Sequence, residues 1–230
     1  MSNKHLEYLK NANKRMSENP IGDFYVGELR IYIKEPVPEH INVKECFSYI
    51  LQKMPRIFYE NLDKVFIGQF PFLKSRQVDA IYKDRCIYIT NNQETNQSLV
   101  ADIIHEIAHA FEDSRKDELY GDQEIKKEFL SKRHALYGAL ETNKMVVDEI
   151  PKKDFYNTEY SDKFDNYLYK TLGYNRLEPL ITNIFISPYA ATCLREYFAN
   201  AFEIFFVNDL SLVRNYAPSV YKKLIQYLEF

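Results

Sequence analysis

The amino-acid sequence predicts an α+β protein, and two patterns along the chain support this prediction. The first 90 residues contain short runs of alternating or β-branched apolar residues, which are typical of strands. The rest of the chain instead repeats its apolar residues at helical spacing. Because the strands come first and the helices follow, we expect a small sheet followed by a mainly helical half.

The expected strands are short and lie in the first part of the chain. They cover residues 24–26, 29–33 and 64–68, and a hairpin over residues 78–90 pairs residues 80–82 with residues 86–89 across a turn at 83–85. One helix is expected among them, over residues 43–54, where apolar residues recur every three or four positions.

The second part of the chain predicts four helices, over residues 97–112, 122–144, 192–207 and 211–228. Residues 151–166 are polar, rich in Tyr and Asp, and begin with Pro151, which predicts a surface loop. The Lys126-Lys127 and Lys132-Arg133 pairs are interspersed with Glu, which predicts a solvated helix face. Residues 1–20 predict a polar N-terminal arm, and we expect residues 21–230 to form a single domain.

Composition argues against several classes of protein. The net charge is −3, from 30 basic and 33 acidic residues, without the basic stripe of a nucleic-acid-binding protein. The three cysteines are too few and too far apart for a disulfide framework. Neither a secretory signal nor an apolar run long enough to span a membrane is found. We therefore expect a cytoplasmic protein, with non-classical export left open and the oligomeric state unspecified.

The most informative motif is HEIAH, which comprises His105, Glu106 and His109 inside an apolar helical run. Positions i and i+4 share one helix face, so the two imidazoles can bind one Zn²⁺ ion. The glutamate between them has the position of a general base in metallopeptidases. The motif therefore predicts a zinc peptidase.

A catalytic zinc usually has a third protein ligand, and HEIAH does not supply it. The other histidines, His5, His40 and His134, lie among charged or turn residues and are expected to be solvated. Residues 194–206 form a nearly apolar helix bordered by Glu196, with Glu203 as a competing carboxylate. The pattern alone leaves open whether Glu196 is a ligand or faces solvent.

The segment EYFANAF, residues 196–202, resembles the third-ligand helix of the family that contains the anthrax lethal factor catalytic domain and the Pro-Pro endopeptidases. The segment NYAPSVY, residues 215–221, is similar to their closing Ala-Pro turn and last helix. A tyrosine seven residues before the ligand glutamate assists catalysis in lethal factor, and Tyr189 stands seven residues before Glu196. The resemblance covers about residues 98–228. It implies a zincin-like fold with zinc ligands His105, His109 and Glu196.

Two departures from that family stand out. The link from His109 to Glu196 is longer, which implies an insertion near residues 145–185. Asn200 occupies a position that is usually acidic. An amide oxygen can still accept a hydrogen bond from a ligand histidine, but it raises the basicity of the imidazole less than a carboxylate does.

The resemblance implies an endopeptidase for an extended peptide or protein segment. Glu106 would move the proton of the attacking water, and Tyr189 would donate a hydrogen bond to the developing oxyanion. In zincin folds an edge strand precedes the motif helix and can bind peptide by strand addition. This assigns substrate binding to Cys86, Ile87, Tyr88 and Ile89, while residues 151–166 and the insertion are candidates to cover the cleft.

Two other readings compete with this one. Peptidases that cleave repressors carry HExxH and a segment E-x-x-A-N-x-F, which Glu196, Ala199, Asn200 and Phe202 also match. They place that segment closer to HExxH and lack the Ala-Pro closing helix. The other reading is a zinc-stabilised binding module without turnover, which the intact Glu106 and Tyr189 disfavour.

Overall fold

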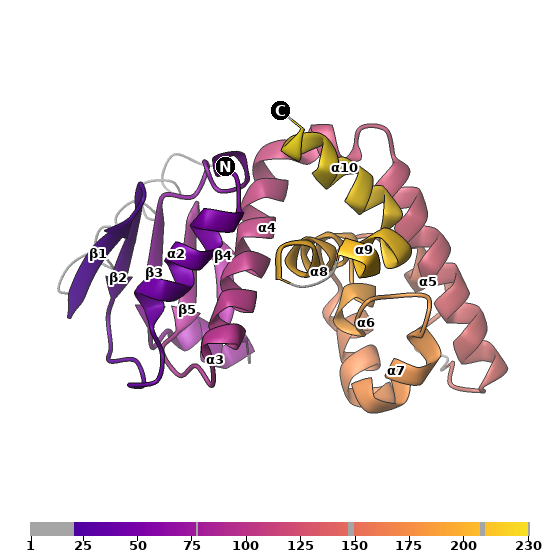
Figure 1. Cartoon of the computed structure of the whole chain (residues 1–230). Coiled ribbons are helices and arrows are strands. Elements are labelled where there is room, and N and C mark those ends of the chain that lie inside the picture. Colours follow the sequence, from indigo (N-terminus) through magenta and orange to yellow (C-terminus); the bar gives the residue numbers. More distant parts are fainter. Residues whose placement is uncertain (1–20, 77, 147–149, 208–209, 230) are drawn as a thin grey trace, which may run out of the picture. The chain divides into compact units, whose positions relative to one another are not determined.

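The computed structural model describes residues 21–229, apart from residues 77, 147–149 and 208–209. The expected arm, residues 1–20, and His5 lie outside the described residues. The chain divides into two compact units, Met1–Phe111 and Glu112–Phe230. The first contains the sheet and the second is helical, so the predicted α+β class is confirmed (Figure 1).

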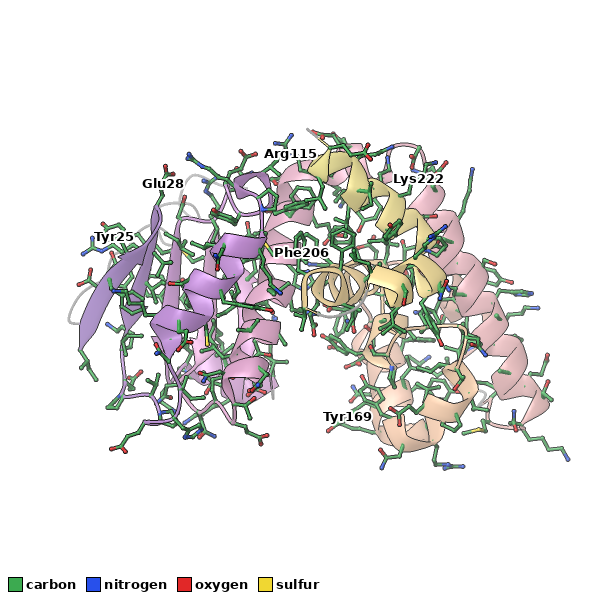
Figure 2. All side chains as sticks on the ribbon, viewed as in Figure 1. Tyr25, Glu28, Arg115, Tyr169, Phe206 and Lys222 are labelled. Carbon is green, nitrogen blue, oxygen red and sulfur yellow. The ribbon has the colours of Figure 1, made fainter. Side chains whose placement is uncertain are left out.

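The first unit contains a five-stranded mixed sheet, and the predicted strands are confirmed. Its strands are β1 (Gly22–Val26), β2 (Leu29–Ile33), β3 (Lys64–Gly68), β4 (Ala80–Lys83) and β5 (Cys86–Thr90), in the order β1-β2-β3-β5-β4. β2, β3 and β5 run parallel, and β1 and β4 lie antiparallel at the two edges. Tyr25, on the edge strand β1, is 58 % exposed (Figure 2).

Helices provide the connections that parallel strands require. The predicted helix at residues 43–54 is confirmed as α2 (Val43–Lys53), which lies across one face of the sheet (Figure 1). A 3-10 turn, η1 (Arg56–Phe58), follows it, and the short α3 (Pro71–Arg76) comes after β3. β4 and β5 are joined by a tight turn, in which Asp84 and Arg85 adopt positive φ angles of 53° and 63°. Two such residues are typical of a type I′ turn, whose twist matches that of paired strands.

Aromatic side chains fill one face of the sheet. The rings of Tyr32, Phe66 and Tyr88 stack on neighbouring strands, with centroid distances of 5.1 and 5.2 Å. Side chains that alternate with them along β3 and β5, namely Val65, Ile67, Ile87 and Ile89, have no exposed surface. The central strands are therefore buried on both faces, as is usual for parallel strands.

The expectation that residues 86–90 form an edge strand is wrong. β5 pairs with β3 on one side and with β4 on the other, so its backbone groups are already used. Its residues Cys86, Ile87, Tyr88 and Ile89 are all buried, the most exposed at 5 %. They cannot bind a peptide by strand addition, and the edge on this side of the sheet is β4 instead.

The motif helix is longer than predicted. It is α4 (Asn96–Tyr120), which continues beyond residue 112 through a non-helical position at Arg115, where φ is −123°. The boundary between the two units falls within this helix. The predicted helices at residues 122–144 and 192–207 are confirmed as α5 (Glu124–Thr142) and α8 (Leu194–Val207). The single helix predicted over residues 211–228 is instead two helices, α9 (Leu210–Tyr216) and α10 (Pro218–Leu228), because Pro218 starts a new helix.

The expectation of a surface loop at residues 151–166 is wrong. The segment forms η2 (Lys152–Tyr156) and α6 (Asp162–Asn166), and Ser161 caps α6 by accepting from the N–H of Phe164. Phe155 and Phe164 are buried, which anchors the segment despite its polar composition. It continues through the π-helical η3 (Tyr167–Leu172), α7 (Tyr174–Ile181) and η4 (Tyr189–Ala191).

In the second unit, α5, α9 and α10 pack against α8 (Figure 1). Glu128 on α5 links two of these helices: it accepts from the hydroxyl of Tyr197 at 2.5 Å and from the N–H of Ser219 at 2.8 Å. The second bond caps the first turn of α10, which begins at Pro218 as the Ala-Pro turn predicts.

No helix among the described residues is long and apolar enough to cross a membrane. Cys46, Cys86 and Cys193 are buried free thiols.

Candidate metal centre

The two motif histidines lie on one face of α4. Leu99, Ile103 and Ile107 on the same helix have no exposed surface and fix its orientation in the core. His105 and His109 then lie one turn apart, with ring centroids 4.9 Å from each other and ring planes at 82°. His109 is 6 % exposed, and His105 is partly exposed. This is the arrangement that the motif predicts.

Glu106 points toward the edge strand of the sheet. Its side chain is 7 % exposed, and its carboxylate accepts a short hydrogen bond from the backbone N–H of Tyr82 on β4. This N–H lies outside the ladder, because neighbouring residues of an antiparallel strand point their backbone groups in opposite directions. The carboxylate is therefore held against the free edge of β4.

Glu196 lies in the first turn of α8. The neighbouring apolar side chains Tyr197, Phe198, Ala201, Phe202 and Phe205 are buried and orient the helix, as the sequence predicts. Cys193 precedes the helix, and burial, followed by the charge of Glu196, raises the pKa of its thiol to about 12. Cys193 therefore stays protonated and does not compete as a thiolate ligand.

His105 and His109 of the first unit each offer a ring nitrogen to a metal ion, and Glu196 of the second unit carries the carboxylate that the sequence analysis assigns as the third ligand. Two imidazoles and one carboxylate are a donor set used by catalytic zinc sites. The chemistry of these donors fits a divalent transition-metal ion and does not by itself select zinc.

Tyr189 opens the 3-10 turn η4, and its carbonyl accepts from the hydroxyl of Thr192 at 2.8 Å. Burial and, after it, the charge of Glu196 raise the pKa of the Tyr189 phenol. The hydroxyl is therefore protonated at neutral pH and can donate a hydrogen bond.

Asn200 stands one turn after Glu196 on α8. Its Oδ1 accepts from the hydroxyl of Ser187 at 2.6 Å, and its Nδ2 donates to the backbone carbonyl of Glu196 at 3.0 Å. The first contact ties α8 to the segment before it, and the second lies within the helix. The expected bond to a ligand histidine stays a prediction.

The segment near the expected insertion contributes neighbours of Glu196 that sequence reasoning missed. The pKa of Asp165 is raised by burial and by Asp162 and Glu196, and its Oδ2 accepts from the hydroxyl of Tyr160 at 3.0 Å. Burial and nearby charges that include Glu196 also raise the pKa of Tyr174. The available signal was the richness in Tyr and Asp, which we interpreted as solvated loop.

The expectation of a solvated face at the basic pairs of α5 holds for Lys127, which is exposed, but is wrong at Arg133, which is 1 % exposed. Arg133 continues the buried stripe of Ile125, Phe129, Leu136 and Leu140. This spacing is visible in the sequence and was the signal for burial.

Comparisons with protein-family models, with curated proteins and with solved structures gave no match to this chain.

Proposed function

We propose that this chain is a zinc-dependent endopeptidase with a zincin-like fold. The observation that carries the proposal is the arrangement on α4, where two imidazoles 4.9 Å apart flank a buried carboxylate. His105, His109 and Glu196 are the residues that would hold the ion. When bound, zinc supplies a Lewis acid that polarises a carbonyl and lowers the pKa of water to about 7.

Different residues of the chain then assist different steps of peptide-bond hydrolysis. A water oxygen forms a bond to the peptide carbonyl carbon, and the C–N bond breaks to give a carboxylate and an amine. Glu106 takes the proton from the attacking water and delivers it to the leaving amine. Tyr189 donates a hydrogen bond to the oxyanion while the carbon is tetrahedral.

The substrate is an extended peptide that lies along β4. The N–H of Thr90 donates to the carbonyl of Asp79 at 2.7 Å, so Asp79 faces β5. Backbone groups of every second residue face the same way, which places those of Ala80 and Tyr82 on the outer edge, where the N–H of Tyr82 already donates to Glu106. Such an edge can accept a peptide as an additional strand.

The decisive experiment combines metal analysis of the full chain with a peptide-library digest. We expect one zinc per chain, loss of cleavage on chelation, and loss of zinc in Glu196→Ala. Glu106→Gln should keep its zinc and lower kcat by about 10²–10⁴-fold, the usual contribution of a general base. Glu203→Gln, on the same helix as Glu196, is the matched control and should leave both zinc and kcat unchanged.

Three results would count against the proposal or favour an alternative. Cleavage that survives in Glu106→Gln would remove Glu106 from the reaction. Stoichiometric zinc without cleavage of any peptide would favour a zinc-stabilised binding module. Cleavage confined to a folded repressor would favour the repressor-cleaving class of peptidase.

A further inference from the structure

Arg133 is a buried cation to which the proposed chemistry gives no role. It lies 1 % exposed in the middle of the apolar stripe of α5. Burying a charge is strongly unfavourable unless hydrogen bonds replace those lost to water. Its partners therefore indicate what the residue does.

Those partners are three backbone carbonyls and three aromatic rings, of which the ring of Phe164 is the nearest. Nη1 donates to the carbonyl of Ala191 at 2.6 Å and to that of Thr192 at 3.0 Å. Nη2 donates to the carbonyl of Asp154 at 2.8 Å. The guanidinium carbon lies 3.7 Å from the centroid of the Phe164 ring. The face of an aromatic ring is electron-rich and therefore attracts a cation.

The first two carbonyls belong to the turn that joins Tyr189 to the helix of Glu196. Ala191 ends η4, and Thr192 precedes Cys193, whose carbonyl accepts from the N–H of Tyr197 at the start of α8. The guanidinium thus fastens α5 to the short segment between the proposed oxyanion donor and the proposed third ligand.

We infer that Arg133 is a positioning residue, which holds the turn between Tyr189 and Glu196 in the geometry that the reaction needs. This inference rests on the proposed function. The planar guanidinium of arginine suits the site because it donates to three carbonyls and also stacks on an aromatic ring. The ammonium group of lysine is instead a single point charge.

The test compares Arg133→Met with Lys132→Met in the full chain. Lys132 is the matched control, because its Nζ donates to the carbonyl of Ile184 at 2.6 Å and not to the turn. Hydrogen exchange of the metal-free protein should be at least tenfold faster at residues 189–196 in Arg133→Met. In Lys132→Met the change should be confined to residues around Ile184.

The second measurement is of zinc affinity and of the kinetic constants kcat and KM. For Arg133→Met we expect zinc affinity to fall about 10–100-fold, as when other supporting groups of metal ligands are lost. Its kcat should fall at least tenfold with KM within threefold of wild type, whereas Lys132→Met should keep both within twofold. If Arg133→Met does not fold, Arg133→Lys replaces it, with the same localised change at smaller amplitude.

Three results would overturn the inference: unchanged exchange at residues 189–196, exchange raised uniformly over residues 112–229, or a loosened turn with wild-type kcat and zinc affinity. Failure of the proposed function is distinguishable, because wild type would then bind no zinc and cleave no peptide. The exchange measurement would still decide whether Arg133 holds the turn.

Discussion

At the scale of single residues, the proposed chemistry depends on groups whose surroundings set their protonation. Tyr189 remains a phenol because burial and the charge of Glu196 both disfavour its anion. A neutral hydroxyl of this kind can donate to an oxyanion but cannot act as a base. Its contribution should therefore appear in kcat and not in metal binding.

Substitution of this hydroxyl gives a direct test. Tyr189→Phe should lower kcat by about 10²–10³-fold, the usual effect of removing one oxyanion donor. Zinc content should be unchanged, and the melting temperature should shift by only a few degrees. Steady-state kinetics and calorimetry measure the two quantities.

The matched control for Tyr189→Phe is Tyr197→Phe. The hydroxyl of Tyr197 is buried in the same unit, but it donates to Glu128 at 2.5 Å. Its loss should lower the melting temperature and leave kcat within threefold of wild type. Equal kinetic effects in the two variants would remove Tyr189 from the mechanism.

At the scale of elements, the edge strand β4 lies next to Glu106, the proposed general base. Ile81 pairs with Tyr88 of β5, whereas the N–H of its neighbour Tyr82 donates to Glu106 outside the ladder. Proline lacks an N–H and is tolerated on edge strands where that group faces away from the sheet. Adjacent residues of β4 should therefore respond differently to proline.

Tyr82→Pro should fold with a melting temperature close to wild type, while its kcat/KM falls at least tenfold. The loss follows because the N–H that orients the carboxylate of Glu106 is gone. Ile81→Pro removes a ladder bond and should lower the melting temperature markedly. Wild-type kcat/KM in Tyr82→Pro would show that this edge is not used.

At the scale of the whole molecule, both compact units bury free thiols. Burial raises the pKa of Cys86 in the first unit and of Cys193 in the second to about 12, from an ordinary value of 9.0. A raised pKa in the folded state means that the stabilising contribution is complete below about pH 9. It is lost as the pH rises from there toward 12.

Above about pH 9, each of these thiols should lower the free energy of unfolding by about 1.4 kcal/mol per pH unit. Urea unfolding between pH 7 and 11 measures this slope, and Cys86→Ala should make it shallower. A thiol reagent should label no cysteine in the folded protein and all three after unfolding. Rapid labelling of the native protein would contradict the described burial.

Periodicity predicted the strands and most helices, because it records which side chains face a core. Periodicity gave a wrong prediction where a few buried residues determine the local structure. In residues 151–166, Phe155 and Phe164 anchor short helices within a polar composition. Arg133 was interpreted as solvated because charged side chains are seldom fully buried.

The sequence by itself determined the α+β class, the motif helix, and the pairing of His105 and His109 on one face, since these depend on local spacing. Only the tertiary structure decided which strand is the edge, because strand order depends on pairing between distant segments. It alone also decided that the guanidinium of Arg133 meets the carbonyls of Ala191 and Thr192. Contacts between residues that lie far apart along the chain form only when the whole unit packs, so no local pattern encodes them.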